Sequence, residues 1–128
     1  MAKLDLLTAN DRSGEYPPSY SASAARKLSP FPPARGSHRA DVCIVGAGYT
    51  GLSAALHLRQ RGYEVLVLEA QRVGFGASGR NGGHVSTGQR VEQDELEGLM
   101  GKEMARKLWD IGNEAVDLVR TLSRDPSV

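Results

Sequence analysis

The stretch that decides the fold is residues 41–69, which read DVCIVGAGYTGLSAALHLRQRGYEVLVLE. Residues 41–45 form a short apolar run rich in β-branched side chains, which is typical of a buried strand. Residues 49–61 carry apolar side chains at helical spacing, and Gly62 stands where a left-handed helix cap belongs. Residues 64–69 form a second apolar run. The order strand, helix, strand within about 30 residues predicts a βαβ unit with parallel strands.

A glycine motif lies between the first strand and the helix. Residues 46–51 read Gly-Ala-Gly-Tyr-Thr-Gly and match G-x-G-x-x-G. Gly46 permits the tight turn, Gly48 lets the backbone approach a pyrophosphate, and Gly51 lets the helix pack against the strand. The helix start then offers unpaired N–H groups and the positive end of its dipole to the phosphates. The motif in this context predicts a dinucleotide site.

An acid ends the second predicted strand. Glu69 follows Gly51 at close to the expected interval of about 20 residues. Its carboxylate can accept hydrogen bonds from both ribose hydroxyls of an adenosine and would repel a 2′-phosphate, which disfavours NADP. The motif with its acid does not by itself separate NAD from FAD.

A second glycine cluster follows at residues 74–83, which read GFGASGRNGG. Successive glycines let backbone amides converge on an anion or a flat ring. Ser78 adds a hydroxyl and Arg80 adds a fixed positive charge. A ligand-binding loop is the favoured interpretation, and a surface linker is the alternative.

These residues together resemble a known family. The strand, the glycine motif, Glu69, Arg72 and the Ala-Ser-Gly-Arg-Asn-Gly-Gly stretch are similar to the N-terminus of FAD-dependent oxidoreductases of the D-amino-acid oxidase and sarcosine oxidase type. Within that group the sequence is most similar to gamma-glutamylputrescine oxidase-like enzymes. Residues 8–17 and 88–91 are also similar to the corresponding stretches of those enzymes. The resemblance covers nearly the whole chain.

The resemblance implies FAD as the cofactor and assigns roles to matching positions. The motif glycines would hold the pyrophosphate, Glu69 the ribose, and Arg72 would lie near the adenosine or pyrophosphate. The second cluster would contact the phosphates, the ribityl chain and the flavin ring. The expected cofactor-binding residues are Gly46, Ala47, Gly48, Tyr49, Thr50, Gly51, Glu69, Ala70, Arg72, Ala77, Ser78, Arg80, Asn81, Gly82 and Gly83.

The implied chemistry is removal of a hydride from the carbon beside a substrate amine, which gives an imine that water hydrolyses. Oxygen would reoxidise the flavin, and the cofactor carries the redox chemistry. The substrate would be a small amine or amino acid. No catalytic residue is assigned, and His84, the titratable residue nearest the cluster, is favoured as an ordinary loop histidine.

The fold expected is α/β: the N-terminal βαβ portion of a Rossmann-like FAD-binding domain, followed by a glycine-rich loop and amphipathic helices. A short helix from residue 94 should break at Gly101, and a longer one should run to about Ser123. The apolar stripe expected on the longer helix comprises Met104, Leu108, Ile111, Ala115, Leu118 or Val119, and Leu122, with Trp109 packing beside it. Two such apolar strands need neighbours and helices on both faces, so we expect the domain to be incomplete and this chain alone to be inactive.

Residues 1–40 form a proline-rich N-terminal arm, and residues 41–128 the N-terminal part of the FAD-binding domain. The arm has no helix or strand period of useful length. It is interpreted either as a disordered tail or as an arm that wraps over a larger body, with Tyr16, Tyr20 and Phe31 as anchors.

Composition excludes several other classes. The chain has 128 residues and a net charge of +1, so it has no general attraction for nucleic acid or anionic lipid. Its one cysteine, Cys43, cannot form an internal disulfide or a multi-cysteine metal site and is expected to be a small buried strand residue. The longest uncharged stretch is a poor membrane span, no leader is recognised, and a cytoplasmic protein is expected.

Two alternatives in function remain open. The chain could be a non-catalytic dinucleotide-binding module, such as one half of a two-chain assembly, or a fragment. It could also be an NAD-dependent dehydrogenase domain, which explains residues 41–69 equally well but leaves the second glycine cluster and the arm unexplained.

Overall fold

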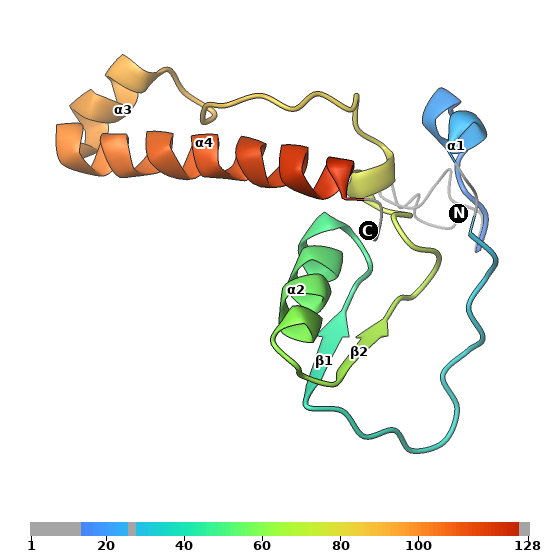
Figure 1. The fold of residues 1–128 in the computed structure, drawn as a ribbon. Helices are drawn as coiled ribbons and strands as arrows, with labels where there is room; N and C mark the ends of the chain where they lie inside the picture. Colours follow the sequence, from blue (N-terminus) through green and yellow to red (C-terminus); the bar gives the residue numbers. More distant parts are fainter. Residues whose placement is uncertain (1–13, 26–27, 126–128) are drawn as a thin grey trace, which may run out of the picture. The chain divides into compact units, whose positions relative to one another are not determined.

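The computed structural model describes residues 14–25 and 28–125 of the chain. It divides into two units, the first ending at Gly82 and the second beginning at Gly83, and each is described by itself. The elements are α1 (Tyr20–Ala24), β1 (Val42–Val45), α2 (Tyr49–Gln60), β2 (Val65–Leu68), the 3-10 helix η1 (Ala77–Gly79), α3 (Gln93–Met100) and α4 (Lys102–Arg124) (Figure 1).

The first unit contains the predicted βαβ arrangement. Strands β1 and β2 pair in parallel, with Val42 opposite Val65 and Val45 opposite Leu68. Helix α2 connects them, and Gly62 follows it with a φ of +91°, as expected for the cap. The α/β fold class with parallel strands is therefore confirmed, and the element bounds fall within about a residue of those expected.

Only one face of this sheet is covered by the described residues. Ile44 faces α2, and Val42 and Ile44 are half-buried. Their neighbours Cys43 and Val45 point to the opposite face because side chains alternate along a strand, and both are exposed. The expected burial of Cys43 is thus wrong for this structure, since a helix packs on one side of the sheet alone.

The arm is docked against the rest of the first unit through one of its three expected anchors. The Tyr16 hydroxyl donates to the carbonyl of Val73 at 2.8 Å, across 57 positions of sequence. Tyr20 is 86% exposed and Phe31 is 74% exposed, so neither serves as an anchor here. The interpretation as a docked arm is correct for residues near Tyr16, and residues 1–13 lie outside the described part.

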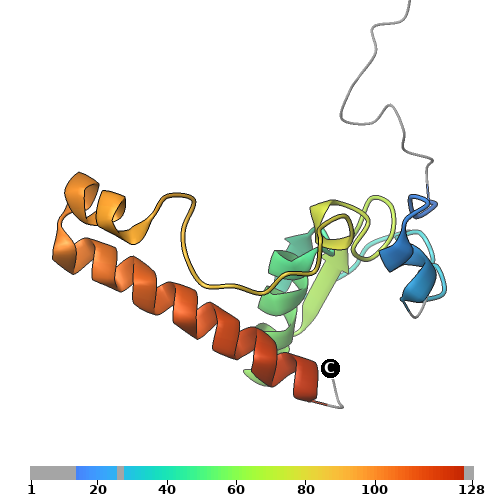
Figure 2. The same cartoon turned by 90° about the horizontal axis from the view of Figure 1, so that it is seen from above.

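The second unit consists of two helices and the segment that leads into them. Gly101, with a φ of +81°, separates α3 from α4, as the sequence predicted. Helix α3 folds back along α4 (Figure 2). Leu96 on α3 and Ala105 on α4 are buried. Gln93 extends this packing by donating from its side chain to the carbonyl of Ala105 at 3.2 Å.

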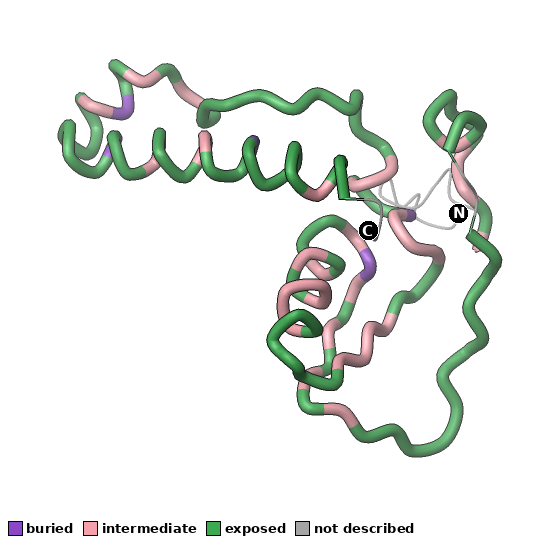
Figure 3. Tube along the Cα trace, in the orientation of Figure 1, coloured by how far each residue is buried: buried purple, intermediate pink, exposed green. Residues whose placement is uncertain are grey.

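The covered face of α4 differs from the expected stripe. Ala105 and Val116 are the buried residues of α4, whereas Met104 and Ile111 are at least half exposed (Figure 3). Leu118 and Val119 are also exposed. Leu108 and Leu122 of the expected stripe are half-buried, so the stripe is confirmed at these two positions only. The reason is that α3 and the preceding segment cover a narrow strip of the helix.

The opposite side of α4 carries charged side chains, as the spacing predicts. Lys107 pairs with Glu103 at 2.9 Å and Arg106 with Asp110 at 3.1 Å, each one helical turn apart. These pairs are exposed and each contributes about 0.3–0.5 kcal/mol. No helix in residues 14–25 and 28–125 has both the length and the apolar content that crossing a membrane requires.

Candidate cofactor site

The site begins at the turn between β1 and α2. Gly46 has a φ of +101°, which side chains rarely tolerate, and its N–H continues the ladder by donating to the carbonyl of Leu68 at 2.7 Å. A Cβ on Gly51 would collide with the carbonyl oxygen of Gly46. The first and third glycines therefore do what the motif requires: one makes the turn and the other brings the helix close against it.

The start of α2 is capped from a distant part of the chain. Its N-cap is Gly48, which has no side chain, and the Ser78 hydroxyl instead accepts from the N–H of Tyr49 at 2.9 Å. A Cβ on Gly48 would lie 2.8 Å from that hydroxyl oxygen. Ser78 thus supplies the capping group, and it brings the second glycine cluster against the first.

Several amides at this helix start have no protein acceptor. Within the described part of the chain, the N–H groups of Gly48, Thr50 and Gly51 donate to no other residue. Unpaired amides at a helix N-terminus, next to the positive end of its dipole, suit a phosphate group. The Ser78 hydroxyl keeps its own hydrogen for a further acceptor, because it accepts the Tyr49 bond.

Glu69 lies directly beside this turn. One carboxylate oxygen accepts from the N–H of Ala47 at 2.8 Å, and the other accepts from the N–H of Gln71 at 2.9 Å. An ionised carboxylate offers about four acceptor positions, so two remain for ribose hydroxyls. The acid is therefore held in place by main-chain donors and still has capacity for a ligand.

Ala47 joins the parts of the site. It is 2% exposed, its N–H donates to Glu69, and its carbonyl accepts from the N–H of Gly74 at 2.8 Å. The residue between the first two motif glycines thus links the acid and the second cluster by its main chain alone. Gly74 and Gln71, which the sequence did not place among the binding residues, take part through backbone geometry that no residue pattern reveals.

The second cluster is a folded loop rather than a linker. A Cβ on Gly79 would collide with the carbonyl of Gly74, so the loop turns tightly. The Asn81 side chain donates to the carbonyls of Ala77 and Ser78 at 3.1 and 2.8 Å, which stabilises η1. Arg80 donates to the carbonyl of Phe75 at 2.8 Å.

Arg80 also stacks on an aromatic ring. Its guanidinium carbon lies 4.7 Å from the centroid of Phe75, whose side chain is among the few buried ones. This contact fixes the charge within the loop. Arg80 and Asn81 are therefore held within the loop by these bonds. Their approach to a flavin ring stays a prediction, as does that of Gly82 and of Gly83, which begins the second unit.

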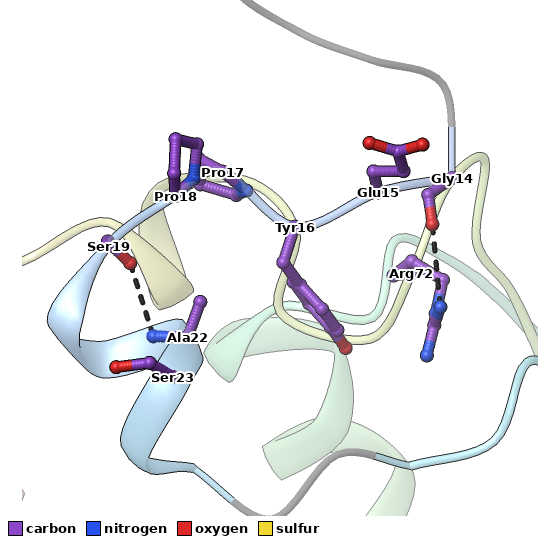
Figure 4. Close-up of a pocket in the computed structure, with 9 residues that line it drawn as sticks. All are labelled: Gly14, Glu15, Tyr16, Pro17, Pro18, Ser19, Ala22, Ser23 and Arg72. Atoms are coloured by element: carbon purple, nitrogen blue, oxygen red, sulfur yellow. Dashed lines mark hydrogen bonds between the residues drawn. The ribbon is translucent and has the colours of Figure 1, made fainter.

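Arg72 and its surroundings face the arm. Its guanidinium donates to the carbonyl of Gly14 at 3.4 Å and to that of Leu28, and it stacks 5.0 Å from the centroid of the Tyr16 ring. A hollow of about 370 Å³ lies between the arm and Arg72 (Figure 4). Its serine hydroxyls bond within the arm, Ser19 to Ala22 and Ser23 to Tyr20, so we assign no ligand to it.

The structure gives less direct support to the predicted cofactor contacts of Arg72 and Ala70 than to those of the glycine turn. The structure shows the Arg72 guanidinium engaged with the arm, and Ala70 is exposed beside Glu69. Their expected contacts with the adenosine remain predictions. Among the described residues, no three His, Cys, Asp or Glu side chains gather where they could hold a metal ion.

The parallel βαβ unit, its glycine turn and its acid define a dinucleotide-binding protein, and the residues present fit a pyrophosphate with an adenosine ribose. Residues 41–128 match the family described as FAD dependent oxidoreductase, and the chain belongs to that family. FAD is the cofactor of this family, so the choice between FAD and NAD that the turn left open is settled in favour of FAD.

Three relatives illustrate the match. Gamma-glutamylputrescine oxidoreductase of Escherichia coli is 46% identical over 106 residues, which are 83% of this chain and 25% of that protein. Probable oxidoreductase OrdL of Haemophilus influenzae is 44% identical over 82% of this chain and 24% of its own length. The protein of the same name from Rhizobium meliloti is 52% identical over 85 residues, which are 66% of this chain and 20% of that protein.

The chain spans a quarter or less of the length of these relatives. No solved structure matches it. The match therefore shows the family and its cofactor, but it does not show the activity of a whole enzyme.

Proposed function

We propose that this chain is the FAD-binding N-terminal portion of an oxidoreductase that oxidises a small amine or amino acid to an imine, with oxygen as the acceptor. The observation that carries the proposal is the placement of Glu69 beside the unpaired amides of the glycine turn. A relative named gamma-glutamylputrescine oxidoreductase supports a substrate with a C–N bond.

The residues of this chain would bind and orient the cofactor. The amides of Gly48 and Thr50, with the Ser78 hydroxyl, would hold the pyrophosphate, and the remaining acceptor positions of Glu69 would hold the adenosine ribose. The loop that contains Arg80 and Asn81 would lie against the flavin ring. Bound FAD supplies the two-electron oxidation of the substrate, while the protein supplies position and electrostatics.

The remainder of the oxidoreductase is proposed to supply the substrate site. The chain covers a quarter of its relatives' length, and no described residue covers one face of the sheet. Both observations support the interpretation that this chain alone does not turn over substrate. The domain boundary at residues 40 and 41 and the cytoplasmic location stay predictions.

The first experiment is an absorption spectrum of the purified chain after reconstitution with FAD and gel filtration. Retained flavin gives absorption bands at about 370 and 450 nm, a property of the cofactor itself. Glu69→Ala should weaken FAD binding by about 1–3 kcal/mol, because a charged hydrogen-bond partner is lost. Glu64→Ala, at the opposite end of β2, is the matched control and should bind as the unchanged protein does. FAD affinity that is equal in all three proteins would contradict the assigned site.

A further inference from the structure

Glu69 is connected to the N-terminal arm through the residue two positions later. The N–H of Gln71 donates to one oxygen of Glu69 at 2.9 Å. The side-chain oxygen of the same Gln71 accepts from the N–H of Gly14 at 2.7 Å. A single residue therefore contacts the ribose-binding acid with its main chain and the arm with its side chain.

The two residues after Gln71 are tied to the arm as well. Arg72 donates to the carbonyl of Gly14 and stacks on Tyr16, and the Tyr16 hydroxyl donates to the carbonyl of Val73. Three consecutive residues that leave the site thus contact one arm segment, Gly14–Tyr16. These contacts span 57 or 58 positions of sequence, so they are not consequences of local turn geometry.

The opposite side of this segment is fixed on the glycine turn. Gly74 donates to the carbonyl of Ala47, and Ala47 donates to Glu69. The segment from Glu69 to Gly74 is therefore held by the turn at both ends and by the arm along its outer side. A carboxylate fixed in this way binds a ligand without first losing rotamer freedom, which strengthens binding.

We propose that Gln71 is a positioning residue of the FAD site, which acts through Glu69 and is itself held by Gly14–Tyr16. The arm is then part of the cofactor site rather than a tail beside it. This inference rests on the proposed function, because it takes Glu69 as the acid that binds the ribose. It requires only residues within the first unit.

The test compares FAD affinity in point variants of the full chain, measured by flavin fluorescence titration. Gln71→Ala keeps the N–H to Glu69 but removes the bond to the arm, and Tyr16→Phe removes the bond to Val73. Each should weaken FAD binding about two- to ten-fold, the range for one hydrogen bond. Gln71→Glu retains an acceptor for Gly14 and should restore the affinity. Gln60→Ala and Tyr20→Phe are the matched controls and should leave the affinity unchanged.

A double-mutant cycle separates positioning from a general loss of structure. Gln71→Ala should cause no further loss in a Glu69→Ala background, since its effect passes through that carboxylate. Amide exchange of Ala47, whose N–H bonds to Glu69, gives a readout without ligand and should accelerate in Gln71→Ala. An equal loss in both backgrounds, or unchanged exchange at Ala47, would overturn the inference.

The outcomes also distinguish this inference from the proposed function. If Glu69→Ala weakens FAD binding and Gln71→Ala does not, the arm has no part in the site and the assignment of Glu69 stands. If Glu69→Ala binds FAD as the unchanged chain does, the assigned site is wrong and the role of Gln71 is overturned with it.

Discussion

At the scale of single residues, Gly48 is the motif glycine at which an added side chain would meet the Ser78 hydroxyl. A Cβ there would lie 2.8 Å from the Ser78 oxygen, and the longer valine side chain would take up room beside the amides that are proposed to hold the pyrophosphate. Gly48→Val should therefore abolish FAD retention while the protein still folds. Retention of flavin after gel filtration measures the effect.

Gly98→Val is the matched control for this prediction. Gly98 has open space where its Cβ would stand and lies on α3, in the other unit. It should change helix stability by well under about 1 kcal/mol, since glycine is a poorer helix former than even β-branched valine, and it should retain FAD. A Gly48→Val protein that remains as yellow as this control would contradict the pyrophosphate assignment.

Residue patterns identified the turn but not the bonds that complete it. Gly46, Gly51 and Glu69 were predictable because the chemistry of the motif demands them at a fixed spacing. The bond from Ser78 to Tyr49 and that from Gln71 to Gly14 were not predictable, because each joins segments far apart in sequence. Such contacts depend on how loops fold back, and a single sequence carries no signal for that.

At the scale of elements, α2 depends on a cap supplied by the second glycine cluster. Ser78→Ala removes the only side-chain acceptor that the structure shows at the start of this helix. We expect a loss of about 0.5–2 kcal/mol in the free energy of unfolding, the range for a lost N-cap, together with weaker FAD binding. Urea denaturation followed by circular dichroism measures the first effect.

Ser37→Ala, in an exposed part of the chain, is the control for that measurement. It should change neither stability nor binding. If Ser78→Ala unfolds at the same urea concentration as Ser37→Ala, the capping bond contributes nothing, and Ser78 would be left with a role toward the ligand alone.

Helical periodicity predicted the existence and ends of α3 and α4 better than their packing. Gly101 could be predicted as the break because the backbone there has a positive φ, which favours glycine, and the glycine is visible in the sequence. The buried strip of α4 depends instead on which segments pack against it. Helical periodicity is recognised from large apolar side chains, so it does not single out a small residue such as Ala105. The large apolar residues beside this strip, among them Met104 and Ile111, are exposed in the described structure.

At the scale of the molecule, the two-stranded sheet presents Cys43 and Val45 on its uncovered face. The thiol of Cys43 should therefore react with a maleimide or a disulfide reagent in the native chain at nearly the rate seen in urea. Mass spectrometry of the labelled protein measures this, and Cys43→Ser provides the unlabelled reference. Labelling that occurs only after denaturation would show that this face is covered, as the sequence alone suggested.

The docked arm also has a consequence for the order of folding. The bond from Gly14 to Gln71 closes a loop of 57 residues, whereas the bond from Ala47 to Glu69 closes one of 22. Closing the longer loop costs about 0.6 kcal/mol more for each doubling of its length. The βαβ unit should therefore form first, and the arm should dock last. On warming, the arm should detach first, so amide exchange at Gly14 should exceed that at Ala47 well below the melting temperature; equal exchange at the two amides would mean that arm and turn unfold as one.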